Sequence, residues 1–490
     1  MKTKIALLFS CAVMIILGGS NFTPSPVTNF TNSSKPASLS VPAERLQDSK
    51  IDLPVVLPID AVGGLDNSPV EPIVIDPVQP VPTSATEVPP ETSSGDQAIN
   101  PLTGLPVQNP ANLLLPPALV TITNWPSSAR PQAGLTFSPI VFEWYIGEGM
   151  SRYQALFYGD YPEKGVPPGS PANYNNNNNS TGDSNSNGNS PQPNSDDVSL
   201  GPIRSGRLPF EKVRSLYNGF LIMASAYKGV AQHLSQFSNV FGSDDTNINS
   251  AMIKVTQLQN IAAATQKITG KMNLTGMTFD STPPPGGQPA SRLWFMYNIL
   301  NEAIWNYDAS AGAYHRYQYT QDNKNTFIAD TDRLNGNPLS YSNVVILFAE
   351  HRACTETAFD VDLMYVNRAP ALLFRDGQVY KIFWTTKNGD YEKTTGKVRP
   401  IRFIDDQGNP FPFKPGQTWI HVMPLRNFVW ETAQNPDVDA MLTDQKKVDS
   451  ELLYNWIKRP QPGSGIWATQ YAASLMIQDD TVCQSIRNMK

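Results

Sequence analysis

A short cationic turn is the clearest candidate for chemistry in this sequence. Residues Gly201–Arg207 read Gly-Pro-Ile-Arg-Ser-Gly-Arg, which sets Arg204 and Arg207 three residues apart between glycines. The planar guanidinium of arginine suits carboxylate and phosphate groups. The Ser205 hydroxyl and nearby backbone N–H groups would complete a nest for an anion. The alternative is that both arginines pair internally with Glu143, Glu148 or Glu211 and only hold the domain together.

A predicted hairpin supplies further charged groups. Alternating residues over Ile140–Ile146 and Ser151–Tyr158, joined by Gly147–Met150, predict two antiparallel strands. With Ile146 opposite Ser151, one face is apolar and packs on the core. The other face then carries Glu143, Tyr145, Arg152 and Gln154. This register predicts a carboxylate beside a guanidinium.

Familiar catalytic and cofactor motifs are missing from the sequence. It has no phosphate-binding Gly-x-x-x-x-Gly-Lys loop, no dinucleotide turn, no Gly-x-Ser-x-Gly elbow and no Cys/His pairs at zinc spacing. We therefore expect no cofactor and no metal site, and the sequence leans against an enzyme. We expect Asp330 and Asp332, which lie in a polar turn, to be solvated carboxylates. A net charge of −6 argues against nucleic acid as a partner.

The first 20 residues predict export. A basic start, Met1–Lys4, precedes an apolar run over Ile5–Leu17 and the small residues Gly18–Ser20, as in a secretory signal peptide. The alternative is an uncleaved anchor. The apolar run continues beyond Cys11, so we do not expect a lipid anchor there. No later run is long enough for a transmembrane helix in the mature chain. We expect an extracytoplasmic protein, secreted or associated with the cell surface.

The cysteines fit that compartment. Cleavage of the signal peptide would remove Cys11 and leave Cys354 and Cys483. Two cysteines in an oxidising compartment favour a disulfide. The alternative is a pair of buried free thiols.

Changes in composition divide the chain. Residues 21–99 are rich in Pro, Ser and Thr and predict a disordered spacer. Residues 167–200 form an Asn/Ser-rich, low-complexity insertion within the region 100–282. The break Pro283–Gly287 precedes a mainly β region, 288–424, and a helical extension, 425–490.

We expect an α+β fold, in which an N-terminal mixed sheet with helices packs against the β region with its helical tail. The expected helices are Tyr227–Phe237, Val255–Ile268, Ser291–Ala303 and a stretch after Asn435.

Several motifs resemble the YerB-like family of bacterial envelope lipoproteins, whose biochemical function is unknown. The resemblance covers about residues 100–424. It rests on Asn100–Leu105, Ala129–Leu135, Ile140–Glu143, Glu148-Gly149 with Arg152, Gly201–Arg207, Tyr307-Asp308 with Tyr314 and Arg316, Asn343–Val345 and Pro415–Trp419. It implies an envelope location and an α+β body with two regions. This chain departs from the family in its insertion, in lacking a lipid-attachment motif, and in reading Ala224–Tyr227 where the family has Gly-Gly-Ser.

Together these features predict a binding module at the cell envelope. We expect Glu143, Glu148, Arg152, Arg204, Ser205 and Arg207 to converge on an anionic or zwitterionic ligand, with Arg130 and Asn124 at the rim. Partners would be a peptidoglycan-derived or other anionic envelope ligand, or an envelope protein. Two alternatives stay open. One is a purely structural protein, and the other is an envelope hydrolase or transferase with Glu143 or Glu148 as general acid and base.

Overall fold

The computed structural model describes the globular part of the chain. The described residues are 97–162, 198–235, 237–239, 251–270, 272–298, 300–320, 326–355, 358–432, 459–471 and 480–488. The expected signal peptide, nearly all of the spacer and most of the insertion lie outside these residues. The helical pattern expected after Asn435 also lies outside them.

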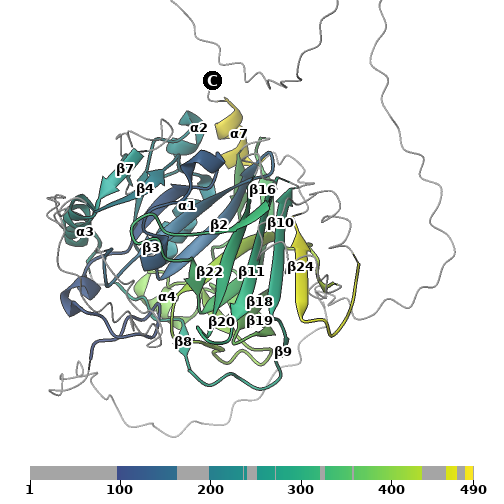
Figure 1. Ribbon diagram of the computed structural model, residues 1–490. Helices are drawn as coiled ribbons and strands as arrows, with labels where there is room; N and C mark the ends of the chain where they lie inside the picture. Colours follow the sequence, from purple (N-terminus) through teal and green to yellow (C-terminus); the bar gives the residue numbers. More distant parts are fainter. Residues whose placement is uncertain are drawn as a thin grey trace, which may run out of the picture. The chain divides into compact units, whose positions relative to one another are not determined.

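One large mixed sheet runs through the described residues (Figure 1). Its main path is β20-β19-β18-β15-β22-β2-β3-β1-β4-β7. Three further strands lie off this path: β5 pairs with β1, β6 pairs with β5, and β9 pairs with β19. The strands are β1 (Ala118–Thr123), β2 (Ile140–Gly147), β3 (Met150–Phe157), β4 (Ser199–Ile203), β5 (Phe220–Met223), β6 (Phe237–Asn239), β7 (Ala251–Lys254), β9 (Gln288–Pro289), β15 (Asn343–Ala349), β18 (Ala369–Arg375), β19 (Gln378–Thr385), β20 (Arg402–Ile404) and β22 (Thr418–Pro424). β2 pairs in parallel with β22, so strands from both sides of Pro283–Gly287 share one sheet.

A second sheet packs against the first. In the described residues it has the order β13-β12-β11-β10-β24-β23, with β14 paired to β12. The strands are β10 (Arg292–Asn298), β11 (Asn301–Asp308), β12 (Ala313–Thr320), β13 (Thr326–Ala329), β14 (Ser340–Tyr341), β23 (Val429–Glu431) and β24 (Ile466–Gln470). Two small sheets pair β16 (His351–Ala353) with β17 (Phe359–Val361), and β8 (Thr278–Phe279) with β21 (Pro412–Phe413).

Short helices flank the sheets. They are α1 (Leu208–Leu216), α2 (Lys228–Ala231), α3 (Val255–Thr269), α4 (Asp390–Thr395) and α7 (Thr481–Asn488), with 3₁₀ turns at Pro110–Leu114, Ser127–Ala129 and Leu135–Phe137. α1 buries Phe210, Val213 and Leu216 at helical spacing against the large sheet. None of the helices in the described part of the chain has the length and apolar character that a bilayer crossing requires.

Apolar side chains fill the space between the two sheets. Val120 and Trp419 of the large sheet share one buried cluster with Phe295 and Trp305 of the second sheet. A separate cluster on the other face of the large sheet includes Phe142 and the buried side of α1. The central strands are therefore buried on both faces, which explains their nearly continuous apolar sequences.

The expected helix over Ser291–Ala303 is wrong. The segment forms β10 and the start of β11 instead. Its side chains alternate: Leu293 and Phe295 face the inter-sheet core, while Trp294 and Met296 enter a different cluster. Alternate residues of a strand point to opposite faces, so each set of bulky side chains is buried in its own cluster. A helix would spread the same side chains around its axis. The expected helix Tyr227–Phe237 is reduced to α2, whereas α3 is confirmed to within a residue of its expected end.

The expected hairpin forms with a different register. Tyr145, not Ile146, lies opposite Ser151, and the pairing shifts between Tyr145 and Gly147. This irregularity moves every cross-strand pair by one residue. Glu143 therefore pairs with Tyr153, and Trp144 pairs with Arg152, so Glu143 and Arg152 point to opposite faces.

The described structure is rich in β-strand with few helices, which is compatible with an α+β fold. Within the C-terminal extension the described residues include the strands β23 and β24 as well as α7, so this part of the chain is not purely helical. β24 lies beside β10 (Figure 1). The disulfide Cys354–Cys483 joins the segment after β16 to α7.

Candidate functional site

The arginine turn links β4 to α1. Backbone hydrogen bonds fix it: Arg204 N donates to Thr121 O (3.0 Å), Ala224 N donates to Arg204 O (3.0 Å), and Gly206 N donates to Ser225 O (3.0 Å). Arg207 occupies the N-cap position of α1. The turn is thus held between β1 and the chain that follows β5.

Arg152 of β3 reaches the same turn from below the helix. Its Nη1 donates a hydrogen bond to Ser205 O (2.9 Å), and the residue is only 8% exposed. Burial lowers the pKa of Arg152 well below its usual value, and the positive charges of Arg207 and Arg204 lower it further. We refer to Arg152, Arg204 and Arg207 as the arginine cluster.

The arginine cluster has no counter-charge among the described residues. None of its three guanidiniums lies within 4.0 Å of a described carboxylate, and the Nε atom of each is buried without a hydrogen-bond partner. Burial lowers the pKa of Arg207 to about 10 and also lowers the pKa of Arg204. Three neighbouring cations destabilise one another unless an anion joins them.

The carboxylates considered as internal partners lie elsewhere. Glu211 accepts from Arg214 Nη2 (2.7 Å) and from Ser235 N (3.0 Å). Glu148 sits exposed in the hairpin turn at a φ of 53°, where its carbonyl accepts from Asn298 Nδ2 (3.4 Å). The structure therefore brings together Arg152, Arg204, Ser205 and Arg207 of the expected site, and it separates them from Glu143 and Glu148.

Glu143 belongs to a buried polar network between the two sheets. Its Oε1 accepts from Ser151 Oγ (2.7 Å), and its Oε2 accepts from Trp419 Nε1 (3.1 Å) and Arg316 Nη2 (3.2 Å). Burial raises the pKa of Glu143, and the positive charge of Arg316 opposes this shift. We call this set the glutamate network: Glu143, Ser151, Asn301, Arg316, Gln318 and Asp330.

The glutamate network closes on itself. Arg316 Nη1 donates to Asp330 and to Gln318, Gln318 Nε2 donates to Asn301 Oδ1 (3.1 Å), and Asn301 Nδ2 donates to Ser151 Oγ (3.3 Å). The guanidinium of Arg316 also stacks 4.9 Å from the ring centre of Trp419. Glu143 and Asp330 thus each bond to the oppositely charged Arg316, as buried ions require, although the Nε atom of Arg316 is buried without a partner.

Arg130 and Asn124 extend the glutamate network instead of lining the arginine cluster. Arg130 Nε donates to Asn124 Oδ1 (3.1 Å), and its Nη1 donates to Tyr319 O on β12 (3.1 Å). Asn124 Nδ2 donates to Ser151 Oγ (2.8 Å). These contacts connect the two sheets.

The expectation of solvated carboxylates at Asp330 and Asp332 is wrong. Asp330 is the partner of Arg316, and Asp332 is fully buried. Asp332 accepts backbone N–H groups from Gly134 (2.9 Å) and Thr136 (2.8 Å), so it fixes a distant loop. Arg316 and Asp330 are the charged residues that our candidate set missed. The signal available was the alternation of Tyr314, Arg316 and Gln318, which places an arginine on the same face of a strand as a buried tyrosine.

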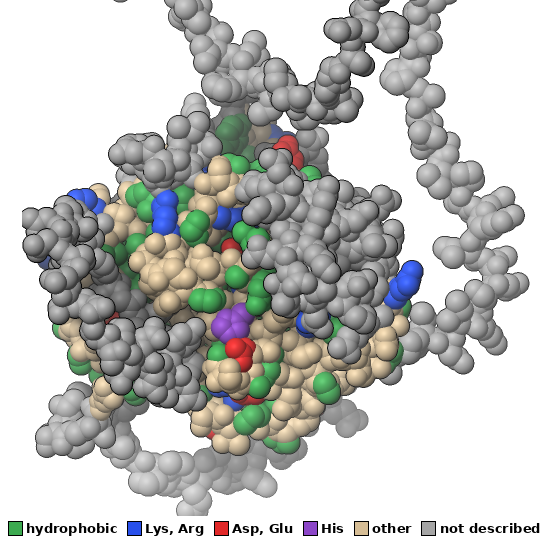
Figure 2. All heavy atoms as spheres, in the orientation of Figure 1, with side chains coloured by type: hydrophobic (Ala, Val, Ile, Leu, Met, Phe, Trp, Pro, Cys, Tyr) green, Lys and Arg blue, Asp and Glu red, His purple; other side chains and the backbone are tan. Residues whose placement is uncertain are grey.

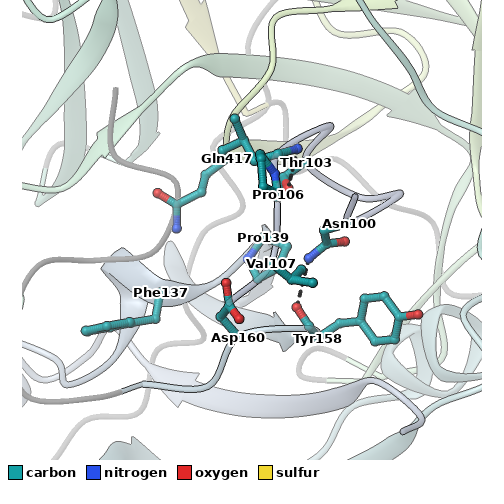
Figure 3. Close-up of a pocket in the computed structure, with 10 residues that line it drawn as sticks. Asn100, Thr103, Pro106, Val107, Phe137, Pro139, Tyr158, Asp160 and Gln417 are labelled. Carbon is teal, nitrogen blue, oxygen red and sulfur yellow. Dashed lines mark hydrogen bonds between the residues drawn. The ribbon is translucent and has the colours of Figure 1, made fainter. Parts of the chain in front are cut away.

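A small hollow lies beside the Asn100–Leu105 motif (Figure 3). Its empty volume is about 300 Å³, open solvent included. Asn100 Nδ2 donates to Tyr158 O (2.9 Å), Asp160 Oδ1 accepts from Gln108 N (2.9 Å), and Gln417 Nε2 donates to Thr136 O (2.6 Å). The polar groups around this hollow therefore connect chain segments. Across the described ranges, no three His, Cys, Asp or Glu side chains are grouped to hold a metal ion.

The fold and the two polar clusters define a β-rich protein whose two sequence regions share one sheet. The "Protein of unknown function (DUF3048) N-terminal domain" matches residues 102–170, and the "Protein of unknown function (DUF3048) C-terminal domain" matches residues 295–420. The Bacillus subtilis (strain 168) protein named "Putative lipoprotein YerB" is 24% identical over 340 residues, which cover 66% of this chain and 86% of that protein. These matches confirm the resemblance to the YerB-like family of unknown function that the sequence motifs indicated.

A solved structure of the YerB protein from Bacillus subtilis is also similar. It is 22% identical, with a TM-score of 0.49, and the match covers 67% of this chain and 97% of that one.

Proposed function

We propose that this protein is an extracytoplasmic envelope protein that binds an anionic ligand at the arginine cluster. One observation carries the proposal: Arg152, Arg204 and Arg207 gather around a turn, and no described carboxylate neutralises them. An anionic group seated there would relieve the repulsion between the three guanidiniums and supply acceptors for their N–H groups.

Other arginines of the chain support this reading by contrast. Each of four partly or wholly buried arginines outside the cluster contacts a carboxylate at 2.7–3.2 Å. The pairs are Arg214–Glu211, Arg316–Glu143, Arg375–Asp376 and Arg399–Glu392. These four guanidiniums each contact a carboxylate, which the three guanidiniums of the arginine cluster do not do among the described residues. Arg130 also lacks a carboxylate contact, but Asn124 and the Tyr319 carbonyl accept its N–H groups.

The surroundings of the cluster favour an anion over a zwitterion. The cluster lies at the N-terminus of α1, whose backbone dipole adds positive potential. Among the described residues, no glutamate joins the cluster to hold an ammonium group. The ligand class is therefore a carboxylate, phosphate or sulfate group, such as a cell-wall peptide stem, an acidic sugar or a polyphosphate would present.

The envelope location is inferred from three features. The first 20 residues have the pattern of a signal peptide, Cys354 and Cys483 form a disulfide, and the relative in Bacillus subtilis is named a lipoprotein. The position of Cys11 inside the apolar run leads us to propose a mature chain without a lipid anchor. An intact-mass measurement of the exported protein tests that point, because an N-terminal lipid adds a mass that cleavage alone does not explain.

Glu143 is a poor candidate for acid–base catalysis. It is fully buried, and its two oxygens accept from Ser151, Trp419 and Arg316. A general acid or base must reach its substrate directly or through one water molecule. We therefore do not carry the hydrolase hypothesis further on this residue.

A thermal-shift screen tests the proposal. The exported protein is heated with muropeptides, acidic sugars and polyphosphates, in parallel with the Arg204→Gln/Arg207→Gln variant. A ligand at 100 times its Kd stabilises the protein by about 2.7 kcal/mol, and this stabilisation should vanish in the variant.

The control removes two exposed cations elsewhere, as Arg426→Gln/Lys381→Gln, and should retain the full shift. A shift that survives in the arginine variant would place the ligand elsewhere. If no anion shifts the melting temperature and the arginine variant melts far below the wild type, the arginines are structural.

A further inference from the structure

A second hollow lies at the edge of the large sheet, away from the arginine cluster. It opens between the segment Thr275–Thr278, which leads into β8, and the segment that carries β20. Its cavity volume is about 430 Å³, which is within the range of small-molecule sites. None of its lining residues belongs to the arginine cluster or the glutamate network. In Figure 1 the labels α4, β20 and β8 mark this end of the sheet.

Positive charge dominates the lining of this hollow. Lys387, Arg399 and Arg402 line it, and the described lining contains no acidic side chain. Arg399 Nε and Arg402 Nη1 both donate to Glu392 Oε1, at 2.7 Å and 3.4 Å, so one buried carboxylate serves two guanidiniums. Within the described residues, Lys387 Nζ has no ion-pair partner, and this side chain is exposed.

The nearest turn carries Asp405 and Asp406, neither of which lines the hollow. Asp405 Oδ1 accepts from Asn409 N (2.8 Å), and its Oδ2 accepts from Asn409 Nδ2 (3.1 Å). These bonds hold the carboxylate within its own turn. The positive charge of the hollow is therefore left for a bound group.

Apolar side chains form the remaining wall, and a glycine keeps the hollow in place. Met277, Phe403, Ile404 and Pro410 line it. A Cβ atom at Gly276 would lie 3.0 Å from Arg402 Cγ, so only glycine lets this backbone approach the arginine so closely. Arg402 is also fixed by the bond from its Nη2 to Lys387 O (3.0 Å). The cations are thus held beside an apolar surface.

We propose that this hollow is a second binding site, which takes a small ligand with an anionic group on an apolar or aromatic body. The anionic group would lie against Lys387 and Arg402, and the apolar body would lie against Met277 and Phe403. The apolar wall distinguishes this second site from the arginine cluster, for which we propose an anionic ligand without requiring an apolar body.

Anilinonaphthalene sulfonate is a suitable probe, because it joins a sulfonate to an aromatic body and fluoresces when bound. We expect saturable binding to the full chain and at least tenfold weaker binding to Lys387→Glu. The matched control is Lys381→Glu, an exposed lysine earlier on β19 that does not line the hollow. It should bind as the wild type does.

A second variant, Met277→Ala, tests the apolar wall and should also weaken binding. The Arg204→Gln/Arg207→Gln variant should bind the probe normally. Equal binding by wild type, Lys387→Glu and Met277→Ala would overturn the proposal, as would a loss confined to the arginine-cluster variant. Because Lys387 is exposed, a folding defect is not expected in its variant, and an unchanged melting temperature would show this.

Discussion

Two neighbouring residues of β3, Ser151 and Arg152, enter polar clusters on opposite faces of one sheet. Ser151 bonds to Glu143 in the glutamate network, and Arg152 bonds to the turn of the arginine cluster. In the glutamate network the charges alternate in sign and the hydrogen bonds form a closed ring. In the arginine cluster the charges have one sign, and no described carboxylate contacts them. The Nε atom of Arg316 also lacks a hydrogen-bond partner, so the two clusters differ in their charges and not in their Nε atoms.

The two clusters differ in how their charges are matched. A buried ion pair stabilises the arrangement of two sheets, and opening it leaves a charge unpaired. A group of like charges is costly until a counter-ion arrives. Under our proposal, the first cluster stabilises the fold and the second binds an anion.

The largest expected effect comes from opening the glutamate network. Arg316→Met leaves Glu143 and Asp330 buried without their cation, which should cost about 3–5 kcal/mol of the free energy of unfolding. Urea unfolding at neutral pH measures this loss. Arg204→Gln, the same charge change in the arginine cluster, should cost less than about 1 kcal/mol.

Should Arg316→Met not be recovered in folded form, the milder Glu143→Gln variant gives the same test with a smaller loss. Equal urea midpoints for Arg316→Met and wild type would contradict the structural role of the network.

Lowering the pH should reduce the free energy of unfolding without reducing the affinity of the arginine cluster for an anion. Burial lowers the pKa of His351 to about 4, from a usual value of 6.5. The unfolded chain therefore binds the proton more tightly, and the stability that neutral His351 provides is complete above pH 6.5 and falls as the pH drops toward 4. The full loss is on the order of 3 kcal/mol.

Unfolding at several pH values, with His351→Gln for comparison, measures this effect. The variant should lose the part of the dependence that His351 contributes, while buried His421, whose pKa is also lowered by burial, continues to destabilise the fold as the pH falls. Sulfate is a suitable anion for parallel binding experiments, since its charge stays constant in this range. Guanidiniums also stay protonated in this pH range. The affinity for sulfate should therefore stay constant while the free energy of unfolding falls. Identical pH profiles for wild type and variant would contradict the assignment to His351.

A substitution in the arginine cluster should abolish ligand binding and leave the stability of the ligand-free protein almost unchanged. Arg152→Met removes one of three like charges and one hydrogen bond to Ser205 O, so the ligand-free protein should stay within about 1 kcal/mol of the wild type. The stabilisation by pyrophosphate, about 2.7 kcal/mol at 100 times its Kd, should be lost. Thermal unfolding with and without pyrophosphate gives both quantities. A large loss of ligand-free stability would make Arg152 a structural residue.

The smallest expected change in stability comes from the backbone at Ser225, beside the arginine cluster. Ser225, whose carbonyl accepts from Gly206 N, has a φ of 65°, a conformation that favours glycine. Ser225→Gly should therefore raise the free energy of unfolding by about 0.5–1 kcal/mol. Ser225→Ala retains the Cβ atom and should give no gain, so an equal gain in both variants would rule out relief of backbone strain.

Local sequence patterns predicted the individual strands and helices better than the register between paired strands. The hairpin strands β2 and β3 and the helix α3 were predicted, because each depends on a period within its own sequence. The hairpin register was wrong by one residue, since the irregularity near Gly147 follows from packing. β10 was mistaken for a helix because a short run of bulky residues fits either period.

The candidate site was predicted in part for the same reason. Arg204, Ser205 and Arg207 are contiguous, so their turn could be seen in the sequence. The partner of Glu143 is Arg316, 173 residues away, and no local pattern connects them. The expected pairing of Glu143 with a nearby arginine therefore failed, and Glu143 moved from the candidate binding site to the interior.

The most direct test observes both clusters in one experiment. The arginine side-chain N–H resonances of the full chain are followed by NMR during a titration with pyrophosphate. We expect the resonances of Arg152, Arg204 and Arg207 to shift together and saturate, while the resonance of Arg316 stays in place. Unmoved resonances in the arginine cluster, or a shift at Arg316 of equal size, would contradict the division into a binding cluster and a structural network.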